Sequence, residues 1–574
     1  MESEAGILRE RRLWRRIQAI KACIDRPLVE LAASVAVSSE PEPFDRRMEL
    51  EWAPIARGQS WGKAYSCAWF HLSGRVPESA HGAHVVALVD LDGEGLVVDQ
   101  EGKALASITS VGTWMDRVQT GRGRSTVELF PMAEGGEELA LWIDAGFNGK
   151  IVQPFGRARF RQARLAIRRD DLFSLHYDYA VLAFAVAALQ GMQAKGRVRA
   201  ARLRSILDEA WAALVQPSGK LGDPDTGSVA KARGILAPEL YQADPGPDES
   251  GFPSFTAIGH AHLDLAWLWP LRETHRKAAR TFAAALENLE RYPGHVFGAS
   301  QGQQFAWIKD ERPELWPRIK AAVAEGRIEL QGGMWVESDA NLPSGEALVR
   351  QLLYGKRFFR DEFGRDMRIC WLPDAFGFPA SLPQILRGAD IDYFMTIKLS
   401  WNERTVFPHR SFRWLGIDGS EVLVHMPPEG DYNSGGTPLC VRQACRNNPE
   451  AQVAPLALLV YGAGDGGGGP GEGHLEFVSR QRSIAGLPRV RQGSAIGFFE
   501  SLERFREALP TWRGELYLEK HQGTYTTQGR QKRANRLMET SLHNLEHAQA
   551  LAFMAFVDPQ TSQQGDQHLV ISGR

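Results

Sequence analysis

The chain begins with short apolar runs that are separated by Gly, Asp and Asn turns. Between residues 40 and 168 these runs include CAWFHLSGRV, HVVALVDLDGEGLVV and ELALWIDAG. Runs at this spacing predict a β-sandwich. A basic stretch with helical character precedes them at 7–27. We therefore expect residues 1–170 to form an N-terminal helix plus a β-sandwich-like domain.

The pattern then changes to a helical period. Residues 171–215 are rich in Ala and Leu at helical spacing, whereas Gly, Pro and Asp crowd positions 217–253. The first part predicts helix and the second predicts a linker. We therefore expect a helical segment and linker over 171–250.

Beyond this point apolar runs alternate with polar or amphipathic segments. The runs are SFTAIGHAH, HVFGAS, RIELQGG, RICWLPD, DYFMTIKL, EVLVHMP and LALLVYGAG. Such alternation of strands and helices predicts a parallel α/β barrel or an open parallel sheet. We expect this unit to span 251–510.

The last periodic stretch, 529–556, forms one apolar helical face. The face consists of Met538, Leu542, Leu545, Ala552 and Phe556. An amphipathic helix of this length predicts one member of a helical bundle, over 511–574. The sequence past Phe556 is polar and without period, so the bundle is expected to be partial. An apolar face without its partners favours association through that patch, as in a homo-oligomer.

Length and charge narrow the classes of partner. The chain of 574 residues is long enough for about three domains. Lys and Arg total 67 against 69 Asp and Glu, a net charge of −2. No overall basic field is therefore available to hold nucleic acid or an anionic lipid surface. A neutral substrate fits this balance better.

No targeting or membrane-spanning pattern is expected. The basic stretch near the start contains acidic residues and lacks a following apolar region, unlike a signal peptide. The longest apolar run, Tyr179 to Leu189, is shorter than the roughly 20 residues that cross a bilayer. The five cysteines are scattered without zinc-finger spacing, as reduced thiols would be. These observations favour a cytoplasmic protein.

Two short motifs carry the candidate chemistry. His262 and Asp264 lie in GHAHLDLAWLWP, and Asp374 lies in WLPDAFGFPASLPQIL. If SFTAIGHAH is a strand throughout, the imidazole and the carboxylate point to the same face and can hold one cation. Asp374 follows a short apolar strand and a Pro, at the C-terminal end of a strand, where α/β-barrel enzymes have their active sites. Together these residues predict a metal-assisted hydrolase.

Each of these features also has a purely structural interpretation. Trp267 and Trp269 would give a sugar ring an apolar wall, or they would fill the barrel core. Asp374 alone is also typical of a turn or a helix N-cap. Asp465 heads the glycine run of LALLVYGAGDGGGGP, which lacks the G-K-[ST] of a phosphate-binding loop. A flexible surface loop is the alternative there.

The chain resembles the α-mannosidases of glycoside hydrolase family 38, in particular the cytosolic type. The resemblance extends in order over WGKAYSCAWFHL, GHAHLDLAWLWP, GGMWVESDANLPSGEALVRQLLYGKRFF, WLPDAFGFPASLPQILRGADIDYFMTIKLSWN, FPHRSFRWLGIDGSEVLVHMPP, YGAGDGGGGP and ELYLEKHQGTYTTQGRQKRANR. It implies an N-terminal β domain, a (β/α)7 barrel and a following helical bundle. It also implies a bound zinc ion, or cobalt as in some cytosolic members. The reaction that it implies is retaining hydrolysis of terminal non-reducing α-D-mannose from an oligosaccharide or mannoside.

The resemblance also implies roles for single residues. His262 and Asp264 match the family's metal ligands, and Asp374 matches the residue that is both a metal ligand and the nucleophile. Trp267 matches the tryptophan that stacks under the sugar.

The acid/base aligns less closely. Asp465 is the first candidate and Asp431, in HMPPEGDYNS, is the second. In a retaining glycosidase the two carboxyl groups stand about 5–5.5 Å apart, and one attacks while the other protonates the departing oxygen. With a cation bound, we expect Asp374 to stay ionised and Asp465 to be held protonated.

The chain departs from the family's pattern in one respect. Family members carry a later H-D-x-x-x-G-type motif whose His is the fourth metal ligand, and this sequence contains no such motif. Either His521 or His568 substitutes, or the chain is a C-terminally truncated or frameshifted product with an impaired site. Two other functions stay open. A metal-dependent carbohydrate deacetylase would release acetate, and a non-catalytic carbohydrate-binding remnant would bind without turnover.

Overall fold

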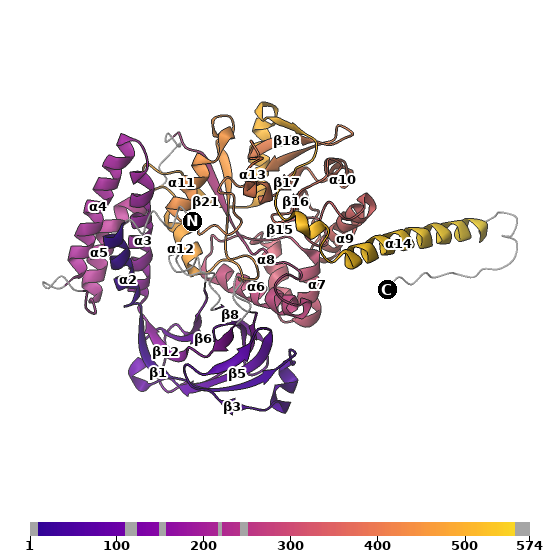
Figure 1. Cartoon of the computed structure of the whole chain (residues 1–574). Helices are drawn as coiled ribbons and strands as arrows, with labels where there is room; N and C mark the ends of the chain where they lie inside the picture. Colours follow the sequence, from indigo (N-terminus) through magenta and orange to yellow (C-terminus); the bar gives the residue numbers. More distant parts are fainter. Residues whose placement is uncertain (1–9, 110–122, 149–155, 216–220, 242–250, 557–574) are drawn as a thin grey trace.

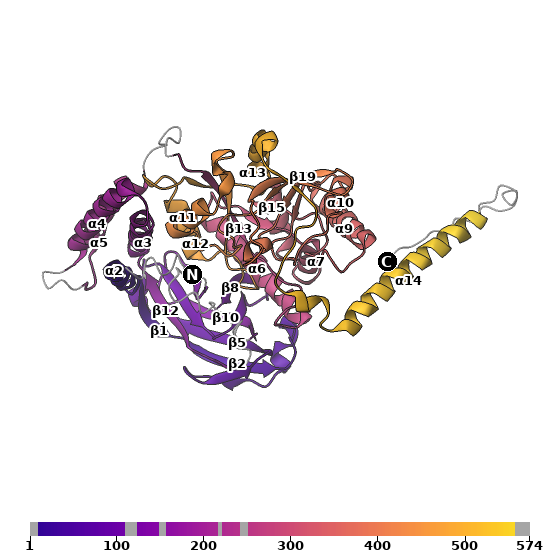
Figure 2. The ribbon, with the colours of Figure 1, turned by 45° about the horizontal axis from the view of Figure 1, so that its top comes forward.

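The computed structural model describes residues 10–109, 123–148, 156–215, 221–241 and 251–556 (Figure 1). In the view of Figure 1 a β-sheet domain lies at the bottom, a group of helices at the left and an α/β unit above. Helix α14 (Gly529–Phe556) projects away from the α/β unit in both orientations (Figure 2).

The β-sheet domain consists of two packed antiparallel sheets. Their strand orders are β1-β12-β6-β9 and β3-β2-β5-β10-β7-β8, and β11 and β4 form a small ribbon. Along β10 every second side chain from Leu139 to Ala145 is buried, because alternate residues face the partner sheet. The predicted sandwich is confirmed. The strands are β1 (Asp25–Glu30), β2 (Ala32–Ser38), β3 (Ala53–Pro54), β4 (Ser60–Lys63), β5 (Ser66–Arg75), β6 (Val85–Asp90), β7 (Glu94–Val98), β8 (Ala104–Thr109), β9 (Thr126–Phe130), β10 (Glu138–Phe147), β11 (Arg157–Arg159) and β12 (Gln162–Arg168).

Four helices share a second core. They are α2 (Arg11–Lys21), α3 (Asp170–Gln190), α4 (Ala194–Leu214) and α5 (Thr226–Leu240). Leu13 and Ile17 of the N-terminal helix are buried in this cluster. The basic N-terminal helix therefore packs on the other helices, and its arginine Arg16 reaches Tyr179 and Asp208.

Helix α5 lies inside the stretch at 217–253 that we expected to be a linker, and there the structure differs. The side chain of Asp225 caps the helix by accepting a hydrogen bond from the Ser228 N–H. Val229, Ala232 and Leu236 are buried at helical spacing, so packing on the neighbouring helices stabilises it. The surrounding Gly, Pro and Asp residues obscured this period in the sequence.

Helix α3 corrects a second expectation. It is long and apolar enough to cross a membrane, whereas the run from Tyr179 to Leu189 alone had suggested a shorter segment. In the structure 89% of its apolar window is buried inside the protein. Its buried Asp178 accepts hydrogen bonds from Arg233 and Arg480, each at 2.8 Å. These contacts are those of a core helix.

Each of the seven expected runs of the α/β unit forms a strand. These strands are β13 (Ser254–His260), β14 (Phe297–Ala299), β15 (Ile328–Leu330), β16 (Ile369–Trp371), β17 (Tyr393–Met395), β19 (Glu421–His425) and β20 (Leu456–Tyr461). They pair in parallel within two sheets, ordered β15-β14-β13-β20 and β16-β17-β19-β18-β22. In addition, β18 (Ser411–Leu415) runs antiparallel to β19, β21 (Val490–Gln492) pairs with β13, and β22 (Thr511–Arg513) pairs with β18.

The two sheets enclose one apolar core. Ile258 and Val460 of the first sheet share a buried cluster with Trp371, Met395 and Leu423 of the second. The backbone pairing of the described strands gives two sheets rather than one closed ring. The expected alternation of strands and helices is confirmed. The helices are α6 (Leu271–Arg291), α7 (Gly302–Glu311), α8 (Trp316–Ala324), α9 (Gly345–Phe363), α10 (Leu382–Gly388), α11 (Pro438–Arg446), α12 (Glu472–Arg480) and α13 (Ala495–Leu502), and the 3-10 helices are η1 (Phe44–Glu49), η2 (Glu78–Ala80), η4 (Lys398–Trp401), η5 (Pro449–Gln452), η6 (Glu503–Ala508) and η7 (Gln522–Tyr525).

Helix α14 confirms the predicted helix. In the described part of the chain, no helical bundle surrounds it. Its residues Leu542 and Leu545 are 50% and 55% exposed. Polar contacts hold the helix to the α/β unit, since Glu546 pairs with Arg350 of α9 and Arg536 donates to the Leu342 carbonyl. The side chain of Phe556 lies outside the described residues.

Candidate active site and metal centre

A cavity of about 250 Å³ opens beyond the C-terminal ends of the parallel strands. Its lining comes from the loops that follow β13, β14, β15 and β16, at the rim where barrel enzymes keep their chemistry. The lining residues are His262, Leu263, Asp264, Leu265, Ala266, Gln301, Glu337, Ser338, Asp339, Asp374, Ala375 and Phe376.

The three predicted ligand residues converge on this cavity. Strand β13 ends at His260, so the H-x-D pair lies on the following loop and not on the strand as expected. One ligand atom each from His262, Asp264 and Asp374 lies within 4.8 Å of the other two. The imidazole is buried and the two carboxylates are half-buried. Two loops that lie far apart in the sequence therefore bring together a potential cation site.

Glu337 is a functional candidate that the sequence analysis missed. Its Oε2 lies 2.9 Å from His262 Nε2, and its Oε1 accepts a hydrogen bond from the Asp374 backbone N–H at 2.6 Å. The backbone N–H of Glu337 donates to Gln301 Oε1 at 3.1 Å. Glu337 therefore connects the two ligand-bearing loops. Its place in the segment after the RIELQGG strand is the signal that would have identified it.

Lys398 is the second missed residue. Its Nζ donates to Asp374 Oδ1 at 2.5 Å and lies 3.7 Å from the centre of the Trp401 ring. The lysine side chain is only 3% exposed. Asp374 is therefore part of a buried ionic cluster, which a simple turn residue would not be. Lys398 follows the DYFMTI strand, so its position directly after a strand also indicated a functional candidate.

Asp465 lies next to the same imidazole. Its Oδ1 is 3.5 Å from His262 Nδ1 and accepts a hydrogen bond from the Tyr432 hydroxyl at 3.0 Å. Asp431, the second acid/base candidate, instead accepts a hydrogen bond from the Asn433 N–H at 2.8 Å, as in an Asx turn. The geometry favours Asp465 over Asp431.

Burial and charge together perturb the pKa values in this group. For both Asp374 and Asp264, burial and the charge of Glu337 raise the pKa, whereas the charge of His262 lowers it. The net result is a raised pKa for Asp374 and a pKa of about 6 for Asp264. Burial alone would lower the pKa of His262, but the charge of Glu337 and contacts with carboxylates raise it well above its ordinary value. Burial opposes ionisation of Asp465 as well, yet its contact with His262 lowers its pKa. These directions are the reverse of our expectation for Asp374 and Asp465, which assumed a bound cation.

The donor set fits a divalent cation. The carboxylates around the buried imidazole repel one another when they are ionised, and this repulsion adds to burial in raising the pKa values of Asp264 and Asp374. A cation among them would relieve the repulsion. One imidazole and two carboxylates are donors that suit zinc and cobalt. Among the described residues, His521 lies outside this three-residue group, and its ring packs on Phe376 with centroids 4.6 Å apart. His568 lies outside the described residues.

The two tryptophans behave differently. Trp269 is buried in the core, donates to the Thr274 hydroxyl at 3.1 Å and stacks under the Lys277 ammonium. Trp267 is 48% exposed and directly follows Ala266, which lines the cavity. Core filling therefore explains Trp269 and does not explain Trp267.

Two family models match the chain. The model of the glycosyl hydrolases family 38 N-terminal domain matches residues 253–515, and that of the alpha-mannosidase jelly roll domain matches residues 27–176. The first match covers the α/β unit with its cavity, and the second covers the two packed sheets.

Curated relatives match over most of the chain. Alpha-mannosidase 2C1 of Homo sapiens is 37% identical over 524 residues, 90% of this chain and 48% of that protein. The alpha-mannosidase of Saccharomyces cerevisiae is 34% identical over 545 residues, again 90% of this chain and 48% of the relative. Alpha-mannosidase G of Dictyostelium discoideum is 33% identical over 535 residues, 90% of this chain and 47% of that protein. The chain thus spans about half the length of these relatives.

Proposed function

This chain belongs to glycoside hydrolase family 38, and on that premise we propose that it acts as a metal-dependent retaining α-mannosidase. Its substrate would be terminal non-reducing α-D-mannose in an oligosaccharide or a simple mannoside. One observation carries the proposal: His262, Asp264 and Asp374 converge on one cavity inside the segment that matches the family model.

In this proposal Asp374 is the nucleophile. Lys398 donates a hydrogen bond to its Oδ1, and Glu337 accepts one from its backbone N–H. The two contacts fix the carboxylate at the cavity wall, and the ammonium favours the ionised form that attacks the anomeric carbon.

Asp465 acts as acid and base. Once His262 is a neutral ligand, its charge no longer lowers the pKa of Asp465, so Asp465 can carry a proton. In the first step it gives this proton to the departing oxygen, and in the second step it takes a proton from the attacking water. Tyr432 donates a hydrogen bond to Asp465 Oδ1, and this contact orients the carboxyl group. Trp267 offers an exposed indole face for the sugar ring.

His262, Asp264 and Asp374 would hold the metal ion. A bound zinc or cobalt ion would supply a Lewis-acid contact to the sugar hydroxyls. Glu337 positions the imidazole by its contact with His262 Nε2.

The remaining parts of the proposal concern architecture and location. The seven expected strands of the two sheets would form one (β/α)7 barrel over 251–510, because β13, β16, β17, β19 and β20 contribute to one buried cluster and β14 and β15 extend the sheet from β13. The chain would divide further into 1–170, 171–250 and a partial bundle over 511–574. Its five cysteines are all free, which supports a cytoplasmic location.

The direct test is hydrolysis of a nitrophenyl α-mannoside by the purified chain, with and without added zinc or cobalt. We expect metal-dependent release of nitrophenol and mannose. Asp374→Ala should abolish turnover and weaken metal binding, whereas Asp465→Ala should abolish turnover and leave metal affinity nearly intact. Release of acetate from an acetylated sugar would instead identify a deacetylase. Sugar binding without any turnover would identify a binding remnant.

A further inference from the structure

The loop that carries Asp465 has an unusual backbone. We refer to residues 462–470, between β20 and α12, as the Asp465 loop. Asp465 itself has φ +51°, and Gly462, Gly466, Gly468 and Gly469 also have positive φ values. A non-glycine residue in this region is strained, and a glycine-rich loop has few side chains with which to fix itself. The loop closes on itself through the paired backbones of Ala463 and Gly469, with both hydrogen bonds at 2.9 Å. Contacts from outside the loop add to this pair.

Helix α6 supplies two of these contacts. Lys277 Nζ donates to the Gly466 carbonyl at 3.4 Å, directly after Asp465. Its approach is so close that a Cβ added to Gly466 would lie 2.6 Å from Lys277 Nζ. At the end of the loop, Asn288 Nδ2 donates to the Pro470 carbonyl at 2.7 Å.

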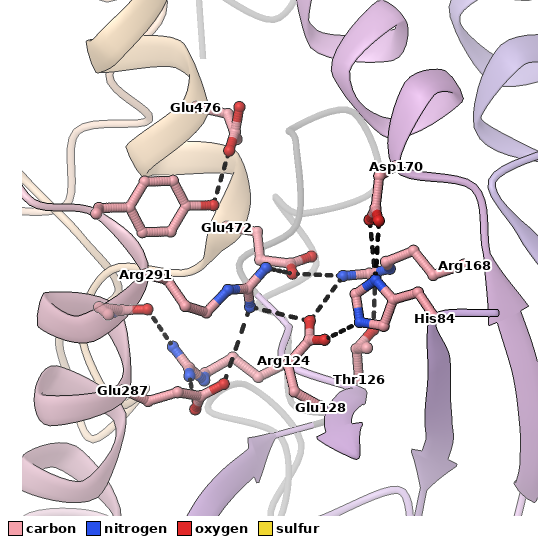
Figure 3. A network of polar contacts seen from close by, with 12 residues as sticks. His84, Arg124, Thr126, Glu128, Arg168, Asp170, Glu287, Arg291, Glu472 and Glu476 are labelled. Carbon is pink, nitrogen blue, oxygen red and sulfur yellow. Dashed lines mark hydrogen bonds and ion pairs between the residues drawn. The ribbon is translucent and has the colours of Figure 1, made fainter. Parts of the chain in front are cut away.

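The β-sheet domain holds both anchors in place. Glu94 of β7 contacts Lys277 Nζ with both carboxylate oxygens, at 2.5 and 2.7 Å. The two side chains are only 6% and 2% exposed. Arg124, just before β9, donates to the Pro470 carbonyl at 3.1 Å. It also pairs with Glu287 of α6 at 2.6 Å (Figure 3). Buried ion pairs from another domain therefore reach the loop at two points.

We propose that the β-sheet domain is a positioning element of the catalytic site: Glu94 and Arg124, together with Lys277 and Asn288, hold the Asp465 loop in its active conformation. This inference rests on the proposed function and extends it to a second domain. None of the four residues lines the cavity or belongs to the potential metal ligands. They act on proton delivery through Asp465, and the hydrogen bonds described above join them to the loop and to charged side chains of α6 and β7 rather than to the nucleophile or the other potential metal ligands.

The kinetic test compares two loop-anchor variants with a matched control. Lys277→Met and Arg124→Met each remove a cation that contacts the loop. Arg276→Met removes a buried cation from the same helix and the same interface, but its partners are Asp144, Ala145, Cys67 and Glu273 rather than the loop. The readout is kcat/KM for two α-mannosides, one with an alkyl leaving group and one with a 2,4-dinitrophenyl leaving group.

A misplaced general acid matters only for a leaving group that needs protonation. For both anchor variants we expect kcat/KM for the alkyl mannoside to fall about tenfold or more, while the dinitrophenyl mannoside changes by about twofold or less. Arg276→Met should change both substrates alike. Equal losses on both substrates in the anchor variants would overturn the proposal.

A second readout does not depend on activity. Hydrogen–deuterium exchange of peptides covering 462–470 should be faster in Lys277→Met and in Arg124→Met, while it stays at the wild-type rate in Arg276→Met. Exchange that is unchanged in the anchor variants, or equally fast in the control, contradicts the inference. If the wild-type chain hydrolyses no mannoside, the proposed function fails, and the exchange result still decides whether these residues hold the loop.

Discussion

At the scale of single residues, the site depends on contacts between loops rather than on any one motif. The H-x-D spacing and the Asp after a Pro predicted that His262, Asp264 and Asp374 lie close together, because ligand types at strand ends form a local pattern, and the structure brings the three together. Glu337 and Lys398 were not predicted, because their roles follow from contacts with residues distant in the sequence. Their positions after strands made both residues candidates, but local spacing contains no information on the pairs that they form.

Glu337 gives the first prediction. Glu337→Gln removes the charge beside His262 Nε2, so the affinity for zinc should fall by about 10–100-fold, as for other carboxylates that support a ligating imidazole. Titration against a competing chelator measures it. Asp339→Asn is the control, because this carboxylate lines the same cavity but accepts hydrogen bonds from the N–H groups of Asn341 and Leu342 rather than from His262. Equal zinc affinity in wild type and Glu337→Gln would contradict the assignment.

The two tryptophans give the second prediction. Trp269→Ala should reduce the free energy of unfolding by about 3–5 kcal/mol, because its indole is buried. Trp267→Ala should cost less than about 1 kcal/mol, because its side chain is half exposed, but should weaken binding of mannose. Denaturant unfolding and sugar titration measure the two effects. Mannose affinity that Trp267→Ala leaves unchanged would show that the indole does not contact the sugar.

At the scale of elements, strands were predicted more completely than helices and connections. The seven expected strands all formed from short apolar runs, since a buried parallel strand is apolar along its length. Strands β21 and β22, which also pair in parallel, were not expected. Helix α5 was missed, because Gly, Pro and Asp around it dominate the local composition. Packing on the neighbouring helices stabilises it, and local composition does not show that packing. The antiparallel strand β18 was also missed, because its sequence contains Arg413 between aromatic residues.

The junction between the β-sheet domain and helix α3 gives the third prediction (Figure 3). His84 lies between Glu128 of β9 at 2.7 Å and Asp170 of α3 at 3.0 Å. The hydrogen bond with Glu128 is the main cause of its raised pKa, and the contact with Asp170 adds to it. A folded-state pKa above the unfolded value means that this stabilisation is complete below the ordinary histidine pKa and is lost as the pH rises through the folded value.

The stability difference between wild type and His84→Gln should therefore be larger at about pH 5.5 than at about pH 8.5. Urea unfolding at the two pH values measures it. His275→Gln serves as a comparison, because His275 contacts Glu311 at 2.6 Å within the α/β unit and bridges no domains. A difference that stays constant with pH would rule out the charged pairing of His84.

At the scale of the whole molecule, both apolar and charged contacts join the parts. The inner faces of the two sheets form one apolar cluster. The main cluster of the α/β unit extends to Trp69 and Leu96 of the sheets, and that of the helical group extends to Phe477 of α12. Charged contacts add to these, since Arg168 of β12 pairs with Glu472 of α12. Periodicity predicted the order of the strand-rich, helical and alternating segments. The ion pairs that connect the domains could not be predicted, because each charged residue taken alone resembles an ordinary surface residue.

The central claim is that Asp374 is the nucleophile of a retaining α-mannosidase. A 2-deoxy-2-fluoro α-mannosyl probe with a good leaving group should trap the glycosyl-enzyme, because the fluorine slows its hydrolysis more than its formation. Peptide mass spectrometry of the labelled, metal-supplied chain should locate the sugar on Asp374, with no label in Asp374→Ala. A label on any other carboxylate, or no label on a chain that hydrolyses mannosides, would contradict this account.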